Sequence, residues 1–152
     1  MASTIDTVLT IADPTAFAIA ISDLVAQSPR SLDDLRPAER VAWCVSELER
    51  EVNNGGFRLF FLNPAGDLAA DTLEALGTIG AHQAATLLRD AIAVFPLPGP
   101  ATAHAVREAQ LDGLPATARE VWDRLDQQFF RYPDDLTRLL RAHVAAHVAD
   151  FR

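Results

Sequence analysis

Two histidines near the C-terminus are spaced for metal chemistry. His143 and His147 stand in the run HVAAH, and this one-turn spacing is the one with which zinc-binding helices present two imidazoles. The general-base glutamate of the zinc metalloprotease motif is absent, and Asp150 is the only further ligand nearby. No cluster of cysteine or histidine completes a coordination shell. We therefore expect these histidines to hold no metal and to form local hydrogen bonds beside an apolar helix face.

The single cysteine, Cys44, is the candidate nucleophile. It stands beside Trp43 inside an expected helix, where cysteine usually serves as a small apolar filler. A nucleophilic thiol needs a nearby base and an anion-stabilising site, and the sequence identifies neither. The serine elbow Gly-x-Ser-x-Gly is absent. Glu47 and Glu51 pair along one helix face, where we expect them to be solvated.

The basic residues exclude several kinds of chemistry. All 13 are arginines, and without lysine the chain cannot form a Schiff base, bind pyridoxal phosphate covalently or build a Walker-type phosphate loop. The 21 acidic residues give a net charge of −8. Direct binding of nucleic acid depends on basic side chains that neutralise phosphates, so we expect none. The residues predict no enzymatic activity, no catalytic residue and no cofactor.

The acidic residues are concentrated in two arginine-free stretches. No arginine precedes Arg30, and none lies between Arg58 and Arg89. We interpret the acids of these stretches as candidate partner-binding residues, and whether the two stretches share one surface is left open. They are Asp6, Asp13, Asp23, Asp67, Asp71 and Glu74.

Three of these acids, Asp67, Asp71 and Glu74, share one stripe of an expected helix. They fall within about 60° of one another in helical projection. The apolar residues of the opposite side are Leu68, Leu73, Leu76 and Ile79. Successive carboxylates rise by roughly 4.5–6 Å, comparable with the phosphate spacing of a nucleic-acid strand. Two interpretations stay open: a face that binds a basic protein, or a helix cap, a first-turn acid and a solvated glutamate.

The pattern of apolar residues and turn formers predicts a single all-α domain over residues 1–152, with about seven or eight helices and no strand. Asp13 and Pro14 are typical of a helix N-terminus. A polar loop is expected over 28–36, and whether residues 1–12 are well ordered is left open. The expected helices begin at 14, 37, 57, 67, near 101, at 115 and at 134, and the last runs to 151. Between the fourth and the one near 101, a further helix is lined by Ala84, Leu88, Ala91 and Phe95.

The remaining composition points to a cytoplasmic protein. One cysteine cannot form an internal disulfide, which favours a reducing compartment. No apolar run approaches the length of a membrane span, and no signal-peptide pattern is present. We expect no membrane partner.

The run EVNNGGF over residues 51–57 is expected to join two helices through a tight corner. Glycine and asparagine enter left-handed backbone geometry at little cost, which suits a left-handed helix cap. We expect a positive φ at Gly55, at Gly56 or at both. We also expect Glu51 to accept hydrogen bonds from the amides that the corner frees at the start of the following helix.

The corner also carries a family resemblance, together with FFLN over 60–63, Gly66, ALGTIGA over 75–81, LDQQFF over 125–130 and the end of the chain over 147–151. Across roughly residues 37–151 the chain resembles a bacterial helical family named after a DNA-mimic protein. The motif residues, which we expect to be structural, are Glu51, Asn53, Asn54, Gly55, Gly56, Phe57, Asn63 and Gly66. The resemblance implies an all-α fold and no enzymatic activity. For the characterised member it implies a dimer whose acidic surface imitates DNA and relieves repression by occupying a transcription factor's DNA-binding face.

Three hypotheses of function follow, in descending order. The first is a non-enzymatic acidic regulator that binds the basic face of a DNA-binding protein such as a transcription factor. The second is a helical immunity-type or adaptor protein whose partner does not bind DNA and whose affinity responds little to salt. The third is an enzyme with a cleft near the corner or near the two histidines. Whether the chain forms a homodimer is left open.

Overall fold

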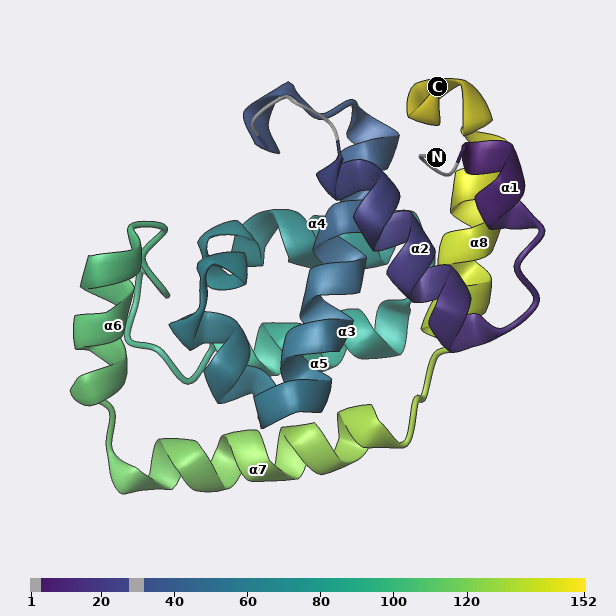
Figure 1. Ribbon diagram of the computed structural model, residues 1–152. Helices are drawn as coiled ribbons and strands as arrows, with labels where there is room; N and C mark the ends of the chain where they lie inside the picture. The colour runs from purple at the N-terminus through teal and green to yellow at the C-terminus, as the bar shows by residue number, and fades with distance from the viewer. Residues whose placement is uncertain (1–3, 28–31) are drawn as a thin grey trace.

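Helices form all the regular structure in residues 4–27 and 32–152, which are the residues that the computed structural model describes (Figure 1). The prediction of an all-α domain is confirmed. The α-helices in these ranges are α1 (Ile5–Leu9), α2 (Pro14–Ala26), α3 (Pro37–Leu62), α4 (Ala69–Thr78), α5 (His82–Ile92), α6 (His104–Asp112), α7 (Ala116–Phe130) and α8 (Leu136–Ala146). The 3-10 helices are η1 (Leu32–Asp34), η2 (Pro64–Leu68) and η3 (Val148–Phe151). No helix of the described residues is both long and apolar enough to cross a membrane.

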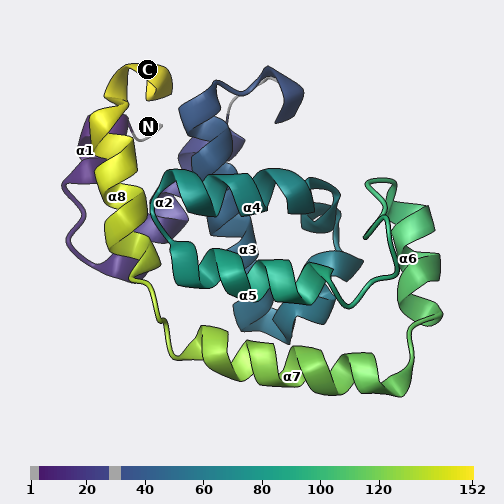
Figure 2. The same cartoon turned by 180° about the vertical axis from the view of Figure 1, so that it is seen from behind.

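The long helix α3 is the centre of the fold. It contacts α2, α4, α6, α7 and α8, and α4 and α5 lie across its rear (Figure 2). Its buried stripe follows the predicted helical spacing, with Val45, Leu48 and Val52 wholly buried. An apolar stripe on one helix needs partners on several sides, so the other helices surround α3.

Aromatic rings fill the space between the end of α3 and α7. Phe61 stacks on Trp122 with ring centroids 5.4 Å apart and meets Phe95 edge-on at 4.9 Å. The indole N–H of Trp122 donates to the carbonyl of Ala91 at 3.0 Å. Paired rings of this kind bury a large apolar area in a specific geometry. They fix α7 against α3 and α5.

The helix α3 is bent where the Asn-Asn-Gly-Gly sequence was expected to form a corner. Gly55 has φ −164° and ψ 20°, and Gly56 has φ 76° and ψ −176°, so neither residue is helical. The positive φ predicted for at least one of these glycines is found at Gly56. After the bend the chain continues as the last part of α3, which carries Phe57, Phe60 and Phe61 into the core.

The N-terminal segment packs through two short helices. The Asp13 carboxylate accepts from the amide of Ala16 at 2.7 Å, and Pro14 opens α2, as predicted. Ile5 and Val8 of α1 are buried. Residues 1–3, and residues 28–31 of the predicted 28–36 loop, lie outside the described residues.

Several helix boundaries differ from the prediction, and α6, for example, begins at His104 and not near 101. The expected helix from Asp67 begins at Ala69, because Pro64–Leu68 forms the 3-10 helix η2 and the capping position falls on Leu68. The last helix ends at Ala146 instead of 151, and η3 follows it. Its cap is Asp135, since Asp134 accepts from the amide of Ala84 at the start of α5 instead.

Candidate functional site

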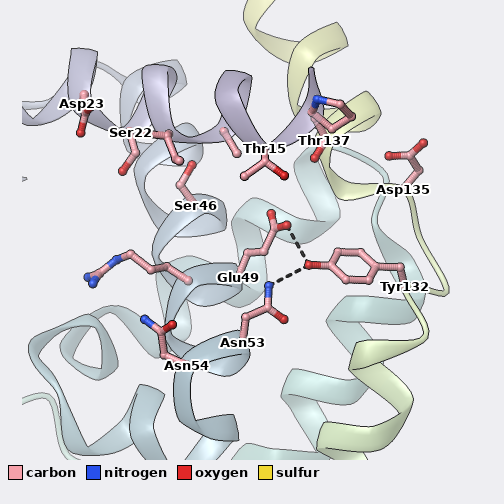
Figure 3. A pocket seen from close by; sticks show the side chains of 14 residues that line it. Thr15, Ser22, Asp23, Ser46, Glu49, Asn53, Asn54, Tyr132, Asp135 and Thr137 are labelled. Atoms are coloured by element: carbon pink, nitrogen blue, oxygen red, sulfur yellow. Dashed lines mark hydrogen bonds between the residues drawn. The ribbon is translucent and has the colours of Figure 1, made fainter. Parts of the chain in front are cut away.

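A cleft of about 870 Å³ lies between α2, the middle of α3 and the start of α8 (Figure 3). One wall is a face of α2 that carries both apolar and polar side chains, and the other carries polar side chains of α3. The α2 residues include Pro14, Ala18, Ile19 and Asp23, and the α3 residues include Ser46, Glu49, Arg50, Asn53 and Asn54. Tyr132, from the connection between α7 and α8, and Asp135 close one end. The cleft thus joins three segments that are far apart in the chain.

Three side chains form a hydrogen-bonded chain at this end of the cleft (Figure 3). Glu49 and Asn53 lie one turn apart on the same face of α3. The Asn53 amide nitrogen donates to the Tyr132 oxygen at 2.8 Å, and the Tyr132 hydroxyl donates to Glu49 Oε1 at 2.9 Å. The phenol is therefore both acceptor and donor, and it joins the α7–α8 connection to α3.

The backbone of Tyr132 is in the left-handed region, with φ 48°. It is the only residue other than glycine with a positive φ in the described part of the chain. Its amide donates to the Phe129 carbonyl at 2.9 Å, and its ring lies 5.9 Å from that of Phe129. A bulky residue in this conformation is unfavourable by about 1–3 kcal/mol and is typical of functional sites. The contacts to Glu49 and Asn53 hold it there.

The carboxylate of Glu49 has no cationic partner among the described residues. Burial raises the pKa of Glu49, the hydrogen bond from Tyr132 lowers it, and Asp135 raises it further. Burial is also the main reason why the pKa of Tyr132 is raised. The Arg50 guanidinium is occupied by Glu47 and by Glu51, the latter at 3.0 Å. Asp135 caps α8 and lies 4.0 Å from the Arg138 guanidinium. Among the described residues, Glu49 and Asp23 are therefore the acids of the cleft without a cationic partner.

We expect Glu49→Gln to raise the free energy of unfolding near neutral pH. A carboxyl with a raised pKa stabilises the fold only while it is protonated, and this stabilisation is lost as the pH rises from the ordinary glutamate pKa through the raised one. Glutamine keeps an acceptor for Tyr132 without the charge. Chemical denaturation of both proteins should show a gain near neutral pH that disappears at acidic pH. The exposed Glu108→Gln on α6 is the control, and a Glu49→Gln protein that is less stable near neutral pH would contradict the expectation.

Ser46 adds an unused polar atom to the floor of the cleft. Its side chain is only 8% exposed, and its Oγ has no hydrogen-bond partner. In Figure 3 the hydroxyl points across the cleft toward α2, on the same side of α3 as the Glu49 carboxylate. A buried hydroxyl without a partner is costly, so this atom is suited to a ligand.

The bend in α3 is capped by Asp126 and not by Glu51, which corrects the prediction. The amide of Phe57 donates to Asp126 Oδ1 at 2.8 Å. Glu51 instead accepts from the Asn63 side chain at 2.7 Å and pairs with Arg50. The capping partner comes from α7, 69 residues further along the chain, and a local motif cannot reveal it.

Glu47 and Glu51 are buried, with 8% and 4% exposure, so the expectation that both are solvated is wrong. Arg50, between them in sequence, pairs with both carboxylates. The pairing offsets the cost of burying charge. These two acids therefore have a structural role in α3, beside the cleft.

Asp67 is bound by a buried arginine. Arg107 is wholly buried, and its guanidinium donates to Asp67 Oδ1 at 2.8 Å and to four backbone carbonyls. Gly66 explains part of this geometry, because a Cβ there would lie 2.8 Å from Arg107 Nε and from the Phe60 carbonyl. Asp67 thus has a structural role in the contact between η2 and α6.

Asp71 and Glu74 line a second hollow of about 320 Å³, between α3, α4 and α8. Asp71 pairs with Arg40 at 3.0 Å, whereas Glu74 is exposed. Cys44 also borders this hollow and is 2% exposed, and burial raises the pKa of its thiol to about 11. A thiol of this kind stays protonated near neutral pH, which fits the predicted role of an apolar filler.

His143 and His147 also line the second hollow. The His147 Nδ1–H donates to the His143 carbonyl at 2.8 Å, so the expected local hydrogen bond is present. Burial lowers the pKa of His143, and His147 lowers it further while Asp150 raises it. In the described ranges no three potential ligands are grouped in a way that could hold a metal ion. That the pair holds no metal stays a prediction.

The six acids proposed for partner binding lie in separate places. Asp6 pairs with Arg152 at 3.2 Å, and Asp13 caps α2. Asp23 is exposed at the cleft, together with Asn53 and Asn54 of the motif. Only Asp71 and Glu74 line a common hollow, and Asp67 is held by Arg107. Asp23 and Glu74 are the two members without a cationic partner or a capping role in the described part of the chain.

Glu49 and Tyr132 are residues of the candidate functional site that the sequence alone did not predict. Tyr132 is the only tyrosine of the chain and stands beside Pro133 between two helices, where an exposed polar aromatic is a candidate for binding. Glu49 precedes Asn53 by one helical turn, so the two side chains share one face of α3. The motif residue Asn53 therefore indicated the face of α3 that lines the cleft. These signals mark candidate positions, but the contact between them depends on the tertiary fold.

One of three comparisons with known proteins gives a match. No curated protein and no solved structure matches the chain. The model of the family described as DMP19-like protein matches residues 33–147. The match includes the whole Asn-Asn-Gly-Gly bend, Glu49, Tyr132 and Arg107, whereas α2 precedes it. The chain therefore belongs to the DMP19-like protein family.

Proposed function

We propose that this protein is a non-enzymatic acidic regulator that binds the basic face of a DNA-binding protein such as a transcription factor. The observation that carries the proposal is the charge of the cleft. Asp23 and Glu49 border it without a cationic partner among the described residues, whereas Asp135 pairs with Arg138. The one arginine that lines it, Arg50, is already bound by two carboxylates. Such a cleft attracts the basic side chains with which DNA-binding proteins contact phosphates.

The net charge and the family support the same proposal. A charge of −8 produces a field that steers a basic partner toward the protein and repels DNA. Membership of the DMP19-like family agrees with the resemblance to a DNA mimic. The net negative charge is not available over the whole surface, however, because Asp67 and Asp71 pair with Arg107 and Arg40. We therefore place the contact at the cleft and not along the stripe of Asp67, Asp71 and Glu74.

The test is capture of a partner from a lysate of the organism that encodes this chain. We expect the captured protein to be a DNA-binding protein, and to be released both by added duplex DNA and by rising salt, because salt screens exposed charges. The double variant Asp23→Asn, Glu49→Gln should retain at most a tenth of the captured protein. Mass spectrometry identifies the partner, and quantitative elution measures its release.

The matched control is Glu108→Gln with Asp112→Asn, which removes two charges from exposed positions on α6. This helix lies at the opposite end of the molecule from α2 and α8 in both views (Figures 1 and 2). The control should capture the partner as well as the unmodified protein does. A partner that stays bound in molar salt and in excess DNA would instead favour the adaptor hypothesis.

A further inference from the structure

The Glu49 carboxylate is partly buried but has no cationic partner among the described residues. One of its oxygens accepts from the neutral Tyr132 phenol, and no basic side chain of the described residues reaches it. Asp23 also borders the cleft, as does Asp135, which caps α8 beside Arg138. A carboxylate that is removed from water is stabilised most by a charge-assisted hydrogen bond to a cation. We propose that this cleft binds one arginine side chain of the partner, with its guanidinium against Glu49, and this inference rests on the proposed function.

The shape of the two walls favours arginine over lysine. Ala18 and Ile19 of α2 offer an apolar wall, and Ile19 is 58% exposed. An arginine stem can lie along such a wall while its planar head reaches a carboxylate with two N–H groups. The ring of Tyr132 is exposed beside Glu49 (Figure 3), and a guanidinium stacks on an aromatic face better than an ammonium does.

The unpartnered Ser46 hydroxyl points to the same ligand. Its Oγ is buried without a hydrogen bond and faces the cleft from the Glu49 side of α3 (Figure 3). A guanidinium has five N–H donors and no acceptor. After two of them bind a carboxylate, the others need oxygen acceptors of this kind.

The volume favours a side chain that is part of a polypeptide. At about 870 Å³ the cleft has the size of a site for a drug-sized ligand. One arginine side chain fills only part of it, which leaves room for the residues on either side. The site is therefore suited to an arginine in an exposed segment of a protein, such as those that contact DNA.

Tyr132 provides the readout, because it is the only tyrosine of the chain. In protein with ¹³C-labelled tyrosine, every ring signal reports on the cleft. The probe is a blocked Gly-Arg-Gly peptide. The comparison peptides replace arginine with lysine or with citrulline, which has nearly the same shape and no charge. We expect the arginine peptide to shift the signal in a saturable way and to bind at least tenfold more tightly than either comparison peptide.

Glu49→Gln should weaken binding of the arginine peptide at least tenfold, while Glu108→Gln should leave it unchanged. The unfolding measurement described above establishes that Glu49→Gln is folded. The inference is overturned by a Tyr132 signal that does not saturate, by equal binding of the citrulline or lysine peptide, or by an unaffected Glu49→Gln protein. Peptide binding without a DNA-binding partner would overturn the proposed function alone. A partner released by DNA, with no binding of the arginine peptide, would overturn this inference alone.

Discussion

Replacing Gly56 with valine should lower the free energy of unfolding by about 3–5 kcal/mol. Gly56 has φ 76°, a conformation that a β-branched residue adopts only with strain. An added Cβ would also overlap the Asp126 carboxylate, whose Cγ would lie 2.7 Å away. The same carboxylate accepts the amide of Phe57, so its displacement would leave that amide without a partner. The expected loss therefore combines backbone strain with a broken charge-assisted hydrogen bond.

Urea denaturation of three glycine variants separates these effects. Gly77→Ala, inside α4, is the control, because no atom lies within 4 Å of the added Cβ. It should stabilise the protein by about 0.5–1 kcal/mol through its helix propensity. Gly55→Ala should fall between the two, since its φ of −164° suits any residue but its Cβ would lie 2.9 Å from Leu59 Cβ. A Gly56→Val protein as stable as Gly77→Ala would refute our account of the bend.

Local patterns predicted the elements of the fold because the interactions that define them are local. The cap at Asp13, the proline after it and the buried stripe of α3 each depend on residues within a few positions of one another. The glycine pair likewise indicated a break in α3, and the positive φ occurs at Gly56. The boundary at Asp67 was wrong because the 3-10 helix η2 and the contact with Arg107 decide it.

Charge partners could not be read from the sequence. Asp67 meets Arg107 from 40 positions away, and Asp71 meets Arg40 from 31 positions away. A stripe that is purely acidic in helical projection is therefore partly neutral in the folded protein. The reverse holds for Glu49, whose neighbour Arg50 in sequence is bound by Glu47 and Glu51. Net charge by segment therefore does not show which acids lack a cationic partner in the folded protein.

The two walls of the cleft differ in whether they lie within the residues that match the family. Its polar side, with Ser46, Glu49, Asn53 and Tyr132, falls within residues 33–147 that match the family. Its other wall is α2, which precedes the match. The Asn-Asn-Gly-Gly motif therefore has two roles, since Gly56 permits the bend while Asn53 holds Tyr132 beside Glu49. The strained Tyr132 backbone and the unpaired Glu49 both reduce stability, and both lie where a partner can bind.

Arg107→Met should be as damaging as the change at Gly56, with a loss of about 3–5 kcal/mol. The Arg107 side chain is wholly buried, and methionine can replace much of its volume but none of its donors. The carbonyls of Phe61, Asn63, Ala101 and Thr102 would lose a hydrogen bond. Asp67 would lose its only ion pair within the described ranges. Unpaired polar groups of this kind each cost about 1–3 kcal/mol when they stay buried.

Chemical denaturation should rank four arginine and aspartate variants in a fixed order. Arg119→Met on the exposed face of α7 should change stability by less than about 0.5 kcal/mol. Asp67→Asn should cost less than Arg107→Met, because asparagine still offers an oxygen to the guanidinium and the Asp67 side chain is 43% exposed. Arg107→Lys should recover little, since an ammonium cannot reach five acceptors that are arranged around a planar fork. If Arg107→Met matched Arg119→Met, the buried guanidinium could not be what joins the end of α3 to α6.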